Sequence, residues 1–102
     1  MRKLYDLAHC RAGDKGNTSI LSLIAYRIED YDLLSRQVTV AVVARHLQGI
    51  VHGTITRYEL PQLQALQFVC DHALNGGVTV SLALDAHGKS LSYALLAMDL
   101  PD

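Results

Sequence analysis

The chain has 102 residues, half of them hydrophobic, and nine basic residues against ten acidic ones leave a formal net charge of −1. A chain of this length is expected to form one domain, residues 1–102, that buries roughly two thirds of its unfolded surface. The balanced charge argues against nucleic acid as a partner, and no apolar run approaches the roughly 20 residues of a membrane-spanning helix. The first residues lack the apolar stretch of a signal peptide, so a cytoplasmic location is expected.

The N-terminal third predicts two strands followed by short helical structure. Side chains alternate over residues 3–9, which indicates a strand, and the polar, glycine-bearing stretch 11–17 that follows is interpreted as a loop. Residues 18–27 are apolar nearly throughout, which suits either a buried strand or a helix. A strand is favoured, because a short glycine loop after one strand returns most simply as a second. Residues 30–36 suit one or two helical turns.

The middle of the chain predicts a helix, a strand and a second helix. Thr39 is suited to the N-cap of the first helix, which Gly49 is expected to end. Alternation over residues 51–59 predicts a strand, and Pro61 suits the first turn of the second helix. The buried stripe of that helix is expected to be Leu63, Leu66, Cys70, Ala73 and Leu74.

The C-terminal third predicts a hairpin, because residues 78–84 and 90–98 alternate and residues 85–89 between them suit a tight turn. The resulting order is β-β-α-β-α-β-β. Amphipathic helices must bury their apolar sides on the sheet, which predicts an α+β fold. The expected form is a two-layer, ferredoxin-like sandwich, in which two main helices cover one face of a mostly antiparallel sheet of about five strands.

The stretch 11–17 holds the strongest cluster of functional groups. Arg11 and Lys15 supply two cations, and the glycines leave backbone N–H groups free to point outward, which suits a carboxylate or phosphate. Asp14 lies between the two cations, which would stabilise its ionised form, so it is assigned to orienting Lys15 or accepting a proton. The alternative is a solvated turn in which Asp14 bonds its own backbone.

His9 ends the first expected strand beside this stretch, so His9 and Asp14 form a hypothetical acid–base pair. The alternative is a strand-end histidine bonded to the backbone. None of the five histidines shows the i, i+4 spacing of a helical zinc site, and no metal or cofactor is expected. Cys10 and Cys70 are expected to be free thiols, with Cys70 in the core. A nucleophilic Cys10 would need a lowered pKa.

Residues 8–17, AHCRAGDKGN, resemble the ARSGDKG motif of the C-terminal domain of acyclic terpene utilisation (AtuA-like) proteins. Further matches are RYELP at 57–61, ALQFV at 65–69, ALNGG at 73–77 and LDAHGK at 84–89. The resemblance implies a ferredoxin-like fold and a setting in bacterial catabolism of branched or terpenoid acids as CoA thioesters. The long form of the family carries a large N-terminal domain, which implies a separately encoded large subunit as a partner.

The leading hypothesis is an accessory, subunit-like domain. It would bind an anionic acyl-CoA-like ligand, or a larger partner, through residues 11–17. One alternative is a small isomerase- or hydratase-like enzyme that uses His9 and Asp14. Another is a pure oligomerisation module, because ferredoxin-like sheets often expose a face or an edge; a homo-oligomer is expected. The ligand-binding residues implied by the resemblance are Arg11, Gly13, Lys15, Gly16 and Asn17, with Asp85 and Lys89 as weaker companions.

Overall fold

The computed structural model describes residues 2–16, 18–71 and 89–100, and within them the side chains of all but Asp14, Lys15, Lys89 and Ser90. Its main sheet is antiparallel, with strands in the order β2-β3-β5-β4. These strands are β2 (Ala8–Lys15), β3 (Thr18–Ala25), β4 (Ile55–Leu60) and β5 (Ala65–Cys70). A second, two-stranded antiparallel sheet joins β1 (Arg2–Lys3) to β6 (Asp99–Leu100).

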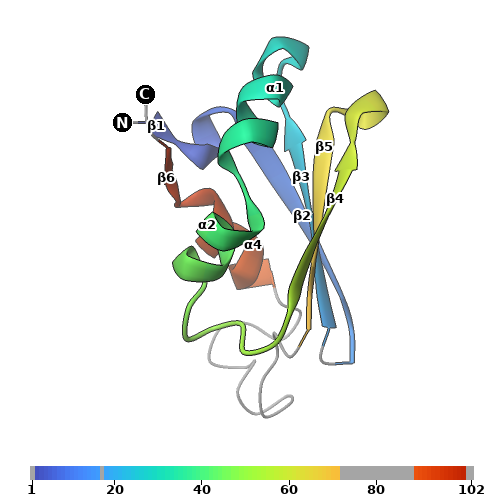
Figure 1. Ribbon diagram of the computed structural model, residues 1–102, viewed down its shortest axis with the longest axis vertical. Coiled ribbons are helices and arrows are strands. Elements are labelled where there is room, and N and C mark those ends of the chain that lie inside the picture. Colours follow the sequence, from blue (N-terminus) through green and yellow to red (C-terminus); the bar gives the residue numbers. More distant parts are fainter. Residues whose placement is uncertain (1, 17, 72–88, 101–102) are drawn as a thin grey trace.

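Helices cover one face of the main sheet (Figure 1). They are α1 (Ile28–Gln37), α2 (Val40–His46) and α4 (Lys89–Leu96). Burial alternates along β3, with Leu21 and Leu23 buried and Ile20 and Ser22 partly exposed, so one side of the strand faces the helices. The core between the layers includes Leu34 of α1, Val43 of α2, Leu66 and Phe68 of β5, and Leu91 and Leu95 of α4. This two-layer α+β arrangement confirms the expected ferredoxin-like class.

The first strand does not lie where alternation placed it. Residues 4–6 form a single 3₁₀ turn, η1 (Leu4–Asp6), and the long strand begins only at Ala8. Leu4 and Leu7 are both buried, a spacing of three that suits a turn rather than a strand. The backbone N–H of Leu4 donates to the carbonyl of Met98, which joins the two ends of the chain.

The prediction of a helix after Pro61 is wrong. Pro61 does begin a helical turn, but this is the short 3₁₀ turn η2 (Pro61–Leu63), which ends at Gln64 in a left-handed conformation (φ 50°). The chain then enters β5, in which Phe68 is buried between Leu66 and Cys70. The rest of the expected helix lies outside the described residues.

The prediction of a strand over residues 90–98 is also wrong, because residues 89–96 form the helix α4. Its buried residues Leu91 and Leu95 are four positions apart, as on one side of a helix, and Tyr93 between them is 71% exposed. The other predicted strand, residues 78–84, and the turn at 85–89 fall outside the part of the chain that is described, except for Lys89 at the start of α4.

The first two helices follow their sequence signals more closely. The side chain of Thr39 accepts a hydrogen bond from the N–H of Val42, which confirms it as the N-cap of α2. The helix ends at His46, before Gly49, which takes a positive φ of 87°. Residues 28–37 form α1, a longer helix than the one or two turns expected. The strand expected over 51–59 is β4, which begins four residues later.

Candidate functional site

The stretch 11–17 is not the loop that its composition suggests. Residues 11–15 belong to β2 and pair with β3 in unbroken register, from Ala8 opposite Ala25 to Lys15 opposite Thr18. Only the connection between the two strands remains as a turn, and Gly16 takes a positive φ of 63° there. Gly13 lies within the strand, opposite Ile20, with open space where a Cβ would be. The candidate residues therefore line one edge strand and the tip of a hairpin.

Arg11 is the one proposed anion-binding side chain that the structure describes. It is exposed on β2 and forms no ion pair with any side chain in the described ranges. Asn17 and Asp85 lie outside the described residues, and Asp14, Lys15 and Lys89 are placed by their backbone only. Convergence of Arg11 and Lys15 on one anion therefore stays a prediction.

His9 and Asp14 are not brought together. They lie five positions apart on β2, which separates their α-carbons by about 17 Å at the usual rise of an extended strand. The ring of His9 instead stacks on Tyr26, with centroids 5.4 Å apart and planes 22° from parallel. Aromatic stacking, rather than the backbone bond considered above, is the contact that the structure gives His9.

Cys10 lies on the side of β2 that packs against the core. Burial, and to a lesser degree the neighbouring Cys70, raise the pKa of the Cys10 thiol to about 12. A nucleophilic cysteine needs the opposite shift. Both cysteines are free thiols, as expected, and Cys70 is buried in the core, although on a strand rather than a helix.

The side of the main sheet away from the helices is uncovered by any described element (Figure 1). Cross-strand neighbours share a face of a sheet, so the register arranges its side chains in rows. We call this surface the open face. Its rows are Arg11, Ser22, Gln67 and Tyr58 in the middle, Gly13, Ile20, Val69 and Thr56 on one side, and His9, Ile24, Ala65 and Leu60 on the other.

The two central strands give the open face an uncharged centre. Ile20 and Ile24 of β3 and Val69 of β5 flank Ser22 and Gln67, whose side chains are 3.4 Å apart in a weak hydrogen bond. Two large exposed apolar side chains lie at the face: Tyr58 (51% exposed), in its middle row, and Tyr26 (62%), which stacks on His9. Apolar groups gathered on an uncovered sheet are typical of a surface that packs against protein.

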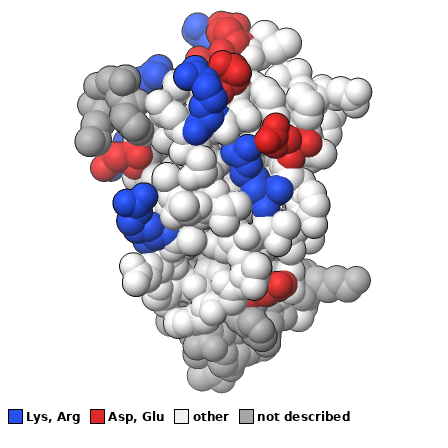
Figure 2. Space-filling view, viewed as in Figure 1, with Lys and Arg blue, Asp and Glu red and all other residues white. Residues whose placement is uncertain are grey.

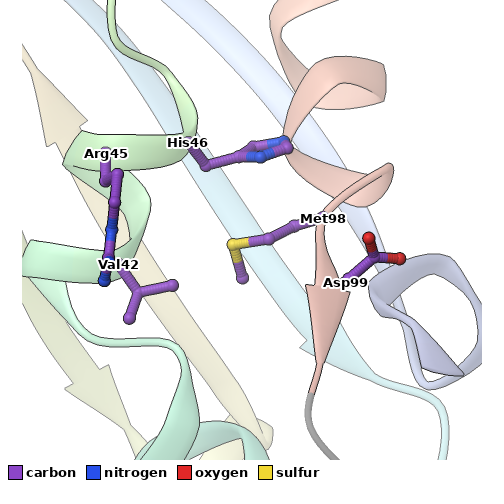
Figure 3. Close-up of a pocket in the computed structure, with 5 residues that line it drawn as sticks. All are labelled: Val42, Arg45, His46, Met98 and Asp99. Carbon is purple, nitrogen blue, oxygen red and sulfur yellow. The ribbon is translucent and has the colours of Figure 1, made fainter. Parts of the chain in front are cut away.

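A hollow of about 330 Å³ lies on the helical side, between α2 and the start of β6 (Figure 3). It is lined by Val42, Arg45, His46, Met98 and Asp99. No sequence motif joins residues 42–46 to residues 98–99, so the sequence alone did not predict that these residues lie together. The side chain of His46 is exposed, and its Nε2 lies 2.6 Å from the carbonyl oxygen of Ala94 in α4.

Charge is distributed in small neighbouring groups of both signs. Figure 2 shows basic and acidic side chains next to one another in the upper part of this view. The ion pairs among the described residues include Arg57 with Glu59 and Arg36 with Asp32. Within residues 2–16, 18–71 and 89–100, no three His, Cys, Asp or Glu side chains cluster as metal ligands would, and no helix is long and apolar enough to cross a membrane.

Comparison with models of known families matches residues 2–101 to one described as the AtuA ferredoxin-like domain. The match covers nearly the whole chain and includes every element of the open face. No curated protein and no solved structure matched the chain.

Proposed function

The chain belongs to the AtuA ferredoxin-like domain family, and on this premise we propose that it is an accessory, subunit-like domain that docks onto a larger AtuA-type protein. The family points to the breakdown of acyclic terpenoid or branched acids as CoA thioesters as its setting. In this role the domain contributes a binding surface, and the chemistry belongs to the larger partner.

The observation that carries the proposal is the open face. Helices bury one side of the sheet, whereas the other side presents Ile20, Ile24, Val69 and Tyr58 to the surroundings. Four strands about 4.8 Å apart, each rising about 3.4 Å per residue, make a surface of roughly 500 Å² before side-chain relief is counted. A specific interface buries at least about 500 Å² on each partner. The open face is therefore large enough to hold one protein partner.

The chemistry of the face defines the surface that fits it. Its centre is uncharged, as the centres of protein interfaces usually are. Arg11 stands at the β2 edge of the middle row, in line with Ser22, Gln67 and Tyr58. A matching partner surface is apolar and hydroxyl-rich, with a carboxylate opposite Arg11. This partner carboxylate would be the anion that residues 11–17 are expected to bind, so the proposal needs no separate small ligand.

Light scattering after size exclusion tests the docking. The chain is mixed with a separately produced large AtuA-type protein, and the mass of the complex is expected to equal the sum of both. Gln67→Lys places a charge in the centre and should abolish the complex. Arg11→Glu reverses the edge charge and should weaken binding about tenfold or more.

Arg45→Glu is the matched control, because it makes the same change on the helical side and should leave the complex intact. Thermal melts show whether each variant is folded. Failure of the folded wild-type chain to bind would overturn the proposal. A dimer of the chain alone that Gln67→Lys disrupts would assign the face to a second copy instead.

A further inference from the structure

The hollow beside α2 combines an apolar floor with a cation, Arg45, that pairs with no acidic side chain among the described residues. Val42 and Met98 point into the same space from opposite sides, one from α2 and the other from the residue before β6 (Figure 3). Met98 is buried and belongs to the core, so it gives the hollow a fixed wall rather than a mobile one. His46 extends across the upper side toward α4, held by its contact with the Ala94 carbonyl.

The two charged residues of the hollow differ in whether they are neutralised. Asp99 forms an ion pair with Lys3 at 2.8 Å, and this pair holds the pKa of the Asp99 carboxyl below its ordinary value. In Figure 3 the Asp99 carboxylate points away from Val42, toward η1. Arg45 runs alongside Val42, and among the described side chains it forms no ion pair. The unbalanced charge at the hollow is therefore positive.

We propose that this hollow binds a small carboxylate with an apolar body of a few carbons. The carboxylate pairs with the Arg45 guanidinium, and the hydrocarbon lies on Val42 and Met98. Its volume of about 330 Å³ lies at the lower end of the range of ligand pockets, which suits a ligand of this size. The cation and the apolar floor orient the ligand, with its carboxylate at the α2 side and its hydrocarbon toward β6.

This site is separate from the docking surface. It lies on the helical side of the molecule, whereas the open face is the opposite side of the main sheet (Figure 1). Ligand binding at the hollow therefore does not depend on the partner proposed above, and either proposal stands if the other fails.

Chemical-shift mapping of the ¹⁵N-labelled chain tests the site with three probes: hexanoate, acetate and hexan-1-ol. Hexanoate is expected to bind with a dissociation constant on the order of millimolar, given its few heavy atoms. Its shifts should centre on α2 and on residues 98–99. Acetate lacks the hydrocarbon and hexan-1-ol lacks the charge, so each should bind at least several-fold more weakly.

Variants separate the two parts of the site. Arg45→Gln keeps hydrogen-bond donors but removes the charge, and should weaken hexanoate binding about tenfold with little effect on hexan-1-ol. Val42→Thr keeps the shape but adds a hydroxyl to the floor, and should weaken both hexanoate and hexan-1-ol.

Arg11→Gln removes an arginine on the open face and serves as the matched control, with hexanoate binding unchanged. Each of three results would overturn the proposal: no saturable shifts with hexanoate, equal binding of hexanoate to wild type and Arg45→Gln, or shifts confined to the β2–β3 hairpin.

Discussion

The guanidinium of Arg57 donates a hydrogen bond to the backbone carbonyl of Val38 at 2.9 Å, which ties β4 to the end of α1. The same nitrogen donates to the carbonyl of Ser35 at 2.8 Å, and the second terminal nitrogen pairs with Glu59 at 2.8 Å. Carbonyls at a helix end have no partner within the helix, so Arg57 satisfies groups that would otherwise stay unbonded. Its side chain is only 16% exposed.

Arg57→Lys should therefore destabilise the protein although it keeps the charge. An ammonium lacks the planar fork that bonds to both carbonyls and the carboxylate together, and the loss should be about 2–3 kcal/mol of unfolding free energy. Urea denaturation measures it. Arg36→Lys, at an exposed i, i+4 pair with Asp32, is the control and should change stability by less than about 0.5 kcal/mol. Equal effects of the two substitutions would show that the Arg57 bonds contribute little.

The N-cap of α2 offers a second test. Thr39→Ala removes the oxygen that accepts from the Val42 N–H and should cost about 1 kcal/mol. Thr39→Ser keeps the acceptor and should remain close to wild type. Both variants can be compared by thermal and urea denaturation, and a Thr39→Ser loss as large as that of Thr39→Ala would mean that the methyl group, not the hydrogen bond, is responsible.

The cysteine thiols predict stability loss at alkaline pH. Burial raises the pKa of Cys10 to about 12 and that of Cys70 to about 11, from 9.0 in the unfolded chain. Folding therefore favours the protonated thiols, and this contribution is complete below pH 9 and is lost as pH rises toward 11 or 12. Urea midpoints should fall across that range. Cys10→Ala should show a shallower fall than wild type; an identical slope would show that other groups cause it.

The ion pair of Lys3 and Asp99 predicts the opposite pH dependence. Its hydrogen bond and charge lower the pKa of Asp99 below 3.8, so the carboxylate stabilises the folded chain above that pH, and the contribution disappears as pH falls through the folded pKa. Asp99→Asn should be less stable than wild type at pH 7, with the difference shrinking in high salt and vanishing in acid. A difference that persists at pH 2 would assign the effect to side-chain packing instead.

Two segments were misassigned because residues four apart suit both a strand and a helix. Leu66 and Cys70 are buried in either structure, and so are Leu91 and Leu95. Only the intervening residues distinguish the two. Phe68 is buried, which requires a strand, and Tyr93 is exposed, which requires a helix. The sequence alone does not show which of these two aromatic side chains is buried in the core. Alternation of apolar residues therefore could not assign either segment to a strand or a helix.

The hairpin was misread for a different reason. Its two glycines suggested a loop with outward-pointing N–H groups, but only Gly16 of the two takes a positive φ, whereas Gly13 pairs with Ile20 as an ordinary strand residue. The open face was anticipated only in general terms, as an exposed face or edge of the sheet. Its rows depend on the β3–β5 register, and β5 was expected to be a helix.

The strand order has a consequence for how the chain reaches its native state. β2 with β3, and β4 with β5, are hairpins of neighbouring segments, whereas β3 and β5 meet only after the chain has passed through α1 and α2. Closing that long loop costs chain entropy before the β3–β5 pairs form, so joining the hairpins should limit the folding rate. Trimming Leu23, opposite Leu66 at this seam, should slow refolding in stopped-flow experiments more than it speeds unfolding.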